Sequence, residues 1–250
     1  FYIELDPGVE SSTQLILTNN GEENSMLYYS LDVSPFSSGL DQLDAFGYAW
    51  IDSEFDNQID YNWIDIEDDH TILQFDSGDG VAAFGIGFNF PFYGTDYGLL
   101  AVMANGWISF DVGGSEEENN GSVFDSDSPK CSIFAFWDDL YPLNEENSNG
   151  TGVVRYHADD DRVVIWYDHV VHDDHSNSNY DFQIVLYRTG EIDVNYREMQ
   201  GDVSSATVGI LDPLGLYGLE VLYNQDNFIQ NEMSVFFDTV PGWINIASDN

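Results

Sequence analysis

The sequence has 250 residues, of which 46 are acidic and only five are basic, so its formal net charge at pH 7 is −41. A charge of this sign and size repels nucleic-acid phosphates and anionic membrane surfaces, and no apolar run is long enough to span a bilayer, so we expect no nucleic-acid partner and no membrane insertion. Because 43% of the residues are hydrophobic and 15% are aromatic, the chain can still build a packed core.

The two ends of the chain predict strands of one small, unfinished sandwich. Residues 1–36 contain strand-like runs at 13–18 and 27–33, and residues 239–250 contain one more. Two or three strands cannot cover an apolar face or satisfy their edge backbone groups, so we expect copies of the chain or adjacent repeats to complete the sandwich. The predicted assembly strands are marked by Phe1, Ile3, Leu5, Leu15, Leu17, Trp243, Ile244 and Ile246.

The middle of the chain, residues 40–238, predicts a separate all-β domain, either a β-sandwich or a jelly-roll-like fold. Short apolar or alternating runs recur about every ten residues and are bounded by Gly, Asn, Asp or Pro, whereas helical periodicity is absent. The runs lie at 81–90, 99–110, 133–136, 152–156, 163–167, 182–187, 192–196, 205–210, 218–223 and 233–237.

Three local patterns in this domain predict structure rather than chemistry. Asn105-Gly106 is typical of a tight hairpin turn, with residues 99–104 and 107–110 as its arms. Alternate aromatics at 88–92 predict a strand that covers the core and ends at a turn with Gly94. The single cysteine, Cys131, precedes an apolar strand, so we expect a buried, unreactive thiol and no internal disulfide.

Acidic loops make bound calcium the expected cofactor. Calcium takes six to eight oxygen ligands from flexible loops, although no loop here has EF-hand spacing, so the signal is one of composition. Asp138 and Asp139 follow an apolar strand and either form a capped turn, bind calcium or act as catalytic acids, the last being disfavoured because adjacent strand residues point to opposite faces. The candidate ligands are Asp52, Glu54, Asp56, Asp138, Asp139, Asp173, Asp174, Asn177 and Asp181.

Three histidines form the one metal-like histidine cluster of the sequence, at His169, His172 and His175. Two of them could bind zinc if the strand bends, but a regular strand places His169 and His172 on opposite faces, which favours a polar edge loop. The sequence contains no G-x-S-x-G elbow, H-E-x-x-H helix, P-loop or dinucleotide-binding glycine pattern, so we expect no enzyme.

Two family resemblances extend these predictions. Residues 5–21 (LDPGVESSTQLILTNNG) and 241–246 (PGWINI) resemble strands of bacterial extracellular immunoglobulin-like repeats, including BACON-like ones. Residues 46–53 (FGYAWIDS), 90–94 (FPFYG), 105–110 (NGWISF), 134–140 (FAFWDDL) and 182–192 (FQIVLYRTGEI) are similar to a nidogen-like β-rich module of secreted peptidases and cell-surface proteins. The resemblance implies an extracellular, non-catalytic module inserted in an incomplete immunoglobulin-like sandwich.

These observations lead to a ranked set of functions. The first is a structural protein of the cell surface, either a self-associating filament subunit or a tandem module, assembled by β-strand complementation and stabilised by calcium. The alternative is an adhesion module that binds glycans or surfaces, suggested by six Trp and 15 Tyr residues, although most of these rings occupy core-like positions. An enzyme ranks third, because only scattered acids favour it.

Overall fold

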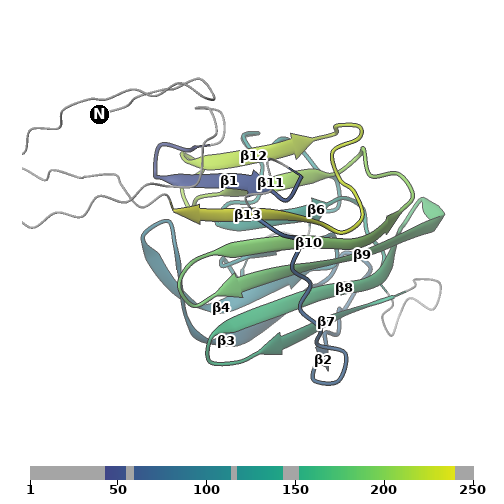
Figure 1. Cartoon of the computed structure of the whole chain (residues 1–250), viewed down its shortest axis with the longest axis horizontal. Coiled ribbons are helices and arrows are strands. Elements are labelled where there is room, and N and C mark those ends of the chain that lie inside the picture. Colours follow the sequence, from purple (N-terminus) through teal and green to yellow (C-terminus); the bar gives the residue numbers. More distant parts are fainter. Residues whose placement is uncertain (1–42, 55–58, 114–116, 143–151, 240–250) are drawn as a thin grey trace, which may run out of the picture. The chain divides into compact units, whose positions relative to one another are not determined.

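A computed structural model describes residues 43–54, 59–113, 117–142 and 152–239. In this part of the chain, strands form two antiparallel sheets that pack face to face, so the prediction of an all-β sandwich is confirmed (Figure 1). None of the described residues belongs to a helix that could cross a bilayer. The predicted terminal strands lie outside the described residues, and the incomplete immunoglobulin-like sandwich stays a prediction.

The first sheet has seven strands and carries most of the long hairpins. Its middle is the β8–β9–β10 meander, in which β8 and β9 pair from Arg162↔Tyr187 to His172↔His175. In spatial order the strands are β1 (Tyr48–Asp52), β13 (Met233–Thr239), β10 (Ile192–Gln200), β9 (His175–Tyr187), β8 (Arg162–His172), β7 (Val153–Ala158) and β2 (Thr71–Ile72).

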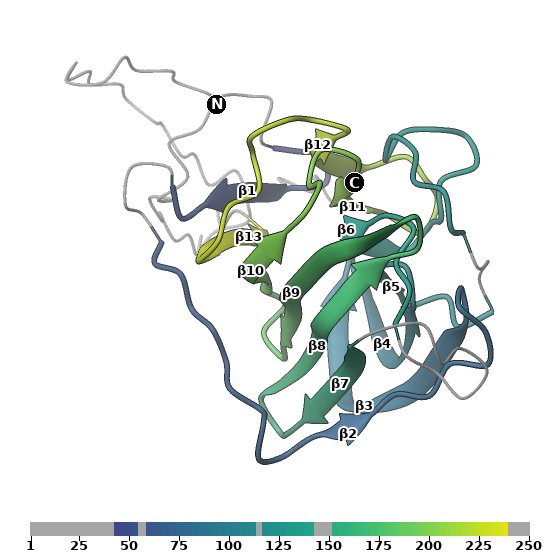
Figure 2. The same ribbon diagram turned by 90° about the vertical axis from the view of Figure 1, so that its right-hand side faces the viewer.

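The second sheet has six strands and supplies the other half of the core. Strand β1 contacts β12, so these two edges adjoin, while β2 and β3 lie at the other lateral side of the sandwich (Figure 2). In spatial order the strands are β12 (Gly218–Tyr223), β11 (Thr207–Leu211), β6 (Ser132–Trp137), β5 (Trp107–Ser109), β4 (Thr95–Met103) and β3 (Val81–Phe92).

The core between the sheets follows from the period of two in the strands. In β3, Phe88, Phe90 and Phe92 are buried while Asn89 is exposed, as the alternating pattern predicts. Two buried tyrosines also tie the sheets together through hydrogen bonds. Tyr167 on β8 donates to the Met103 carbonyl at 2.6 Å, and Tyr196 on β10 donates to the Ala135 carbonyl at 2.6 Å.

The other local predictions are confirmed as well. Asn105 and Gly106 form the turn between β4 and β5, which pair from Ala101↔Ser109 to Met103↔Trp107. Gly106 has a φ of 80°, and a Cβ there would lie 1.9 Å from the Phe136 carbonyl oxygen, so only glycine fits. Cys131 is 5% exposed.

Candidate functional site

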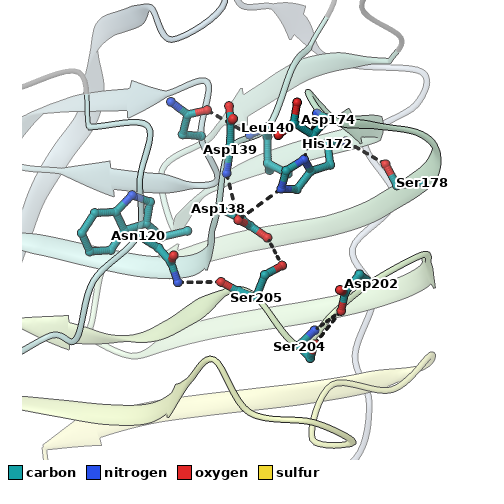
Figure 3. A network of polar contacts seen from close by, with 12 residues as sticks. Asn120, Asp138, Asp139, Leu140, His172, Asp174, Ser178, Asp202, Ser204 and Ser205 are labelled. Atoms are coloured by element: carbon teal, nitrogen blue, oxygen red, sulfur yellow. Dashed lines mark hydrogen bonds and ion pairs between the residues drawn. The ribbon is translucent and has the colours of Figure 1, made fainter.

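A network of polar contacts lies where the loop after β6 meets the end of β8 (Figure 3). Asp138 is buried at its centre. One carboxylate oxygen accepts the Ser205 hydroxyl at 2.6 Å, and the other accepts the Asp139 N–H at 3.0 Å and lies 3.4 Å from His172 Nε2. Since Ser205 precedes β11 and His172 ends β8, this carboxylate links both sheets.

Backbone contacts fix the same junction. Leu140 forms a bridge with His172, and the Asp173 N–H donates to the Asp139 carbonyl at 2.9 Å. The Leu140 N–H also donates to Asn105 Oδ1 at 3.0 Å, which attaches the loop to the β4–β5 turn. The end of β6, the β4–β5 turn and the β8–β9 hairpin are therefore joined by hydrogen bonds.

The surroundings of this junction raise the pKa values of Asp139 and His172. Burial and the nearby charge of Asp173 raise the pKa of Asp139 to about 6. The hydrogen bond to Asp138 raises the pKa of His172. Four predicted calcium ligands meet here, because Asp138 and Asp139 lie beside Asp173, and the Asp174 N–H donates to His172 Nδ1 at 3.1 Å.

These residues fit a cation only in part. Both oxygens of Asp138 are already occupied by protein donors, so Asp138 serves the junction rather than a ligand. The half-buried Asp139 and the exposed Asp173 and Asp174 remain as oxygen donors at the surface of the junction.

A second cluster lies on the face of the seven-stranded sheet that points away from the core. Ligand atoms of Asp168, His169 and Asp181 lie within 4.8 Å of one another. The Asp168 carboxylate accepts Arg155 Nε at 2.7 Å, and Asp181 accepts Arg197 Nε at 2.6 Å. Because arginines already neutralise both carboxylates, this group is a structural ion-pair cluster rather than a good cation site.

Aromatic rings frame these ion pairs. The Arg197 guanidinium lies 4.4 Å from the centre of the Trp63 ring and 4.9 Å from that of Trp166. Trp166 Nε1 donates to Asp181 at 2.6 Å, which leaves both oxygens of this carboxylate bonded. Trp63 belongs to a segment that crosses the sheet, and the next residue, Ile64, exchanges two hydrogen bonds with the Gln183 side chain.

The structure thus separates residues that the sequence predicted to lie in one site. Asp173 and Asp174 lie at the tip of the β8–β9 hairpin, whereas Asp181 lies in β9 and faces Arg197, so residues 173–181 do not form one loop. Asn177 is exposed. His169 contacts Asp168 at 2.5 Å and His172 contacts Asp138, so these histidines belong to different clusters.

The acidic loop that follows β1 provides fewer candidate calcium ligands. Asp52 ends β1 and accepts the Glu54 N–H at 2.9 Å, Glu54 is exposed, and Asp56 lies outside the described residues.

Sequence reasoning missed the residues that complete both clusters. Arg155 and Arg197 are two of only five basic residues in an acidic chain, so their rarity was an available signal. Ser205 and Asn105 carried no such signal, because serine and asparagine are common in turns.

The comparisons with known proteins agree with the fold. A family model described as NIDO related matches residues 54–236, which span β2 to β13 except for its last residues. No curated protein and no solved structure gives a significant match.

Proposed function

The chain belongs to the NIDO-related family, and from that membership we propose that it is a non-enzymatic extracellular module with a structural or adhesive role. The proposal rests on the hydrogen bonds of the buried carboxylates. The buried carboxylates Asp138 and Asp181 are bonded on both oxygens by protein donors, and each joins elements of the sandwich. Such groups hold a scaffold together and are not free to transfer protons to a substrate.

Within this role we propose a self-associating subunit or tandem module of the cell surface, assembled through its terminal strands. Two properties support the proposal. The predicted strands at residues 1–36 and 239–250 need further strands to form a sandwich. The described β-sandwich, in turn, already has a complete core between its two sheets, so it is suited to act as a preformed unit of a larger assembly.

Calcium is proposed as the stabilising ion, with Asp139, Asp173 and Asp174 as the ligands that remain available. These three residues lie at one junction, and a divalent cation there would relieve the repulsion from Asp173 that, after burial, raises the pKa of Asp139. Relief of like-charge repulsion also matters for the whole chain, whose net charge of −41 opposes association between copies.

The adhesive alternative rests on stacking aromatics, and the structure offers few of them. Among the described tryptophans, Trp50, Trp107, Trp137 and Trp166 are buried, and the half-buried Trp63 stacks on Arg197. Polysaccharide binding would therefore depend on exposed tyrosines, of which Tyr217 and Tyr223 are about two-fifths exposed.

Electron microscopy tests the proposal directly. The full 250-residue chain is imaged by negative stain with millimolar calcium and again after chelation. We expect ordered assemblies with calcium and shorter or fewer assemblies without it. Monomers under both conditions would contradict self-association, and assemblies that ignore chelation would contradict the role of calcium. An Asp139→Asn/Asp173→Asn variant should no longer respond to chelation, whereas Asp226→Asn, an exposed aspartate in another loop, should respond as the parent chain does.

A further inference from the structure

The loop between β11 and β12 projects two leucines into solvent on a fixed backbone. Leu214 is 69% exposed and Leu216 is 68% exposed. Beneath them, the buried carboxylate of Asp212 accepts the backbone N–H groups of Leu214 at 3.2 Å, Leu216 at 2.5 Å and Tyr217 at 3.0 Å. The loop is therefore preorganised, and its exposed leucines are not the result of an unstructured turn.

Two neighbours widen this surface. The ring of Phe46 lies 6.4 Å from that of Tyr217, and both rings are 39% exposed. Lys130 is exposed and its alkyl chain runs along Gly215, where an added Cβ would lie 3.1 Å from Lys130 Cε. We call Phe46, Lys130, Leu214, Leu216 and Tyr217 the knob.

Lys130 gives the knob a distinctive charge. It is the single lysine of the chain, and among the described residues it forms no ion pair. An apolar surface with one unpaired cation, in a molecule with 46 acidic residues, calls for a partner surface that is both apolar and acidic.

The chain itself carries an acidic groove whose apolar contacts come from Tyr156 and Ala158. This groove of about 750 Å³ opens between β7 and β3, with Tyr156 and Ala158 on one wall and the glycines at 85 and 87 on the other. A Cβ added at Gly87 would meet no atom within 4 Å, which shows how open that wall is. Three aspartates, Asp69, Asp159 and Asp160, line the same groove together with His70 and His157. His157 lies 3.5 Å from Asp69 and 3.9 Å from Asp159, so Asp160 is the aspartate of the groove to which the structure assigns no ion pair among the described residues.

The leucines of the knob and the groove lie at opposite edges of the six-stranded sheet, while Phe46 packs beside Tyr93 in the β3–β4 turn. Leu214 and Leu216 belong to the loop that joins β11 to β12, whereas the groove is lined by residues of β2, β3 and β7, and β12 and β3 are the two edge strands of that sheet (Figure 2). A contact that joins two different surfaces of one molecule is heterologous, so it can repeat from copy to copy.

We propose that the knob of one copy docks in the acidic groove of the next copy, with Leu214 and Leu216 against Tyr156 and Ala158 and with Lys130 beside Asp160. The proposal rests on the self-association put forward above and gives it a specific lateral contact that does not use the terminal strands. Burial of the leucines supplies affinity, and the lysine selects the acidic groove and sets the orientation.

Carbodiimide cross-linking tests the contact, because it joins amines to carboxylates without a spacer and Lys130 is the single lysine. A mixture of ¹⁴N- and ¹⁵N-labelled full chains is cross-linked at physiological salt and analysed by mass spectrometry. We expect mixed-isotope links from Lys130 to Asp69, Asp159 or Asp160. Links from Lys130 to acids elsewhere, or none at all, would overturn the proposal.

Variants then test the contact in solution by sedimentation velocity. Leu214→Asp/Leu216→Asp should weaken self-association by roughly tenfold or more, as expected for the loss of buried apolar anchors. Tyr223→Asp, at the other end of β12, is the control and should leave self-association unchanged. Lys130→Glu and Asp160→Lys should each weaken it, and their combination in one chain should restore it. Unchanged thermal melting of each variant shows that the fold is intact.

The outcomes separate this contact from the broader proposal. Assemblies that form normally in Leu214→Asp/Leu216→Asp would overturn the knob and groove alone. A parent chain that stays monomeric at every concentration would overturn both. Complexes that stop at two copies would overturn the repeating arrangement.

Discussion

Asp181 shows how a single buried charge is kept in this sandwich. It is 1% exposed, and burial raises its pKa, while hydrogen bonds from Trp166 and Arg197 act in the opposite direction. Without those donors the carboxylate would be a charge in an apolar environment, which is costly. Arg197 is therefore a residue on which the outer face of the sheet depends.

Replacement of Arg197 should expose that dependence. We expect Arg197→Ala to lower the free energy of unfolding by about 2–3 kcal/mol, somewhat below the range for a fully buried pair because the arginine side chain is 36% exposed. Urea denaturation measures the change. Arg188→Ala is the control, since Arg188 stacks on Phe88 and pairs with no carboxylate in the described part of the chain, and it should cost less than about 1 kcal/mol. In an Asp181→Asn background Arg197→Ala should cost less than in the parent, and an equal cost would contradict the ion-pair explanation.

At the scale of the element, the β4–β5 hairpin depends on the absence of a side chain. The turn at Gly106 presses against the backbone of β6, and Asn105 holds the loop that follows β6. The hairpin thus positions Asp138 and Asp139 as well as closing two strands.

Two glycines with nearly the same positive φ separate backbone strain from steric contact. Gly106 and Gly87 have φ angles of 80° and 84°, so an alanine at either site has a positive-φ penalty of about 1–2 kcal/mol. Gly87→Ala should cost only that amount, because its Cβ meets nothing within 4 Å. Gly106→Ala should cost at least about 3 kcal/mol, because its Cβ would overlap the Phe136 carbonyl. Equal losses in thermal or urea unfolding would show that the close approach does not matter.

The elements that sequence predicts best are those with a clear period of two. Strand β12 lies at residues 218–223, as predicted, and β13 extends its predicted run by two residues. The apolar-run pattern missed β1, β2, whose two residues are both exposed, and the first half of β9, where the polar residues 175–181 carry no apolar pattern. Pairing with β8 forms that half of the strand, and such long-range pairing is invisible in a local window.

The candidate site was predictable only in part, for the same reason. The pattern Trp137-Asp138-Asp139 showed that carboxylates follow a buried strand, which is a local fact. Their meeting with His172 and Asp173 depends on the packing of one sheet on the other. Residue types in one window do not determine which distant turn lies beside them.

At the scale of the whole molecule, the raised pKa values of buried groups predict that the folded state is more stable in mildly acidic solution than at neutral pH. Burial raises the pKa of Asp193 to about 6, and burial with the charge of Asp173 does the same for Asp139. Both values exceed the pKa of about 3.9 of an aspartate in an unfolded chain, so the folded state binds more protons between pH 4 and 6. The raised pKa of His172 also makes the folded state less stable as pH rises, because the stabilising proton is lost as pH passes through the folded-state pKa.

The unfolding free energy should therefore fall as pH rises from about 5 to 7.5. Urea denaturation at constant ionic strength measures it, and an Asp193→Asn variant should be less sensitive to pH and more stable than the parent at pH 7.5, by roughly 1–2 kcal/mol. The Tyr187 hydroxyl, which donates to Asp193 at 2.9 Å, can still donate to the amide oxygen. A parent chain that becomes more stable toward pH 7.5 would contradict this assignment.

The pairing of β1 with β13 has a consequence for how such a module can be carried by another domain. Tyr48 lies opposite Thr239, so the backbone enters and leaves the sandwich on neighbouring antiparallel strands, about 5 Å apart. The two points at which the sandwich would join a host domain are therefore no farther apart than the two ends of a hairpin turn. The pairing of β1 with β13 already holds the two ends of the module together, and the folding of the module offsets the entropy lost in closing this loop. Insertion of some 190 residues would therefore cost a host domain about as much entropy as a short connection.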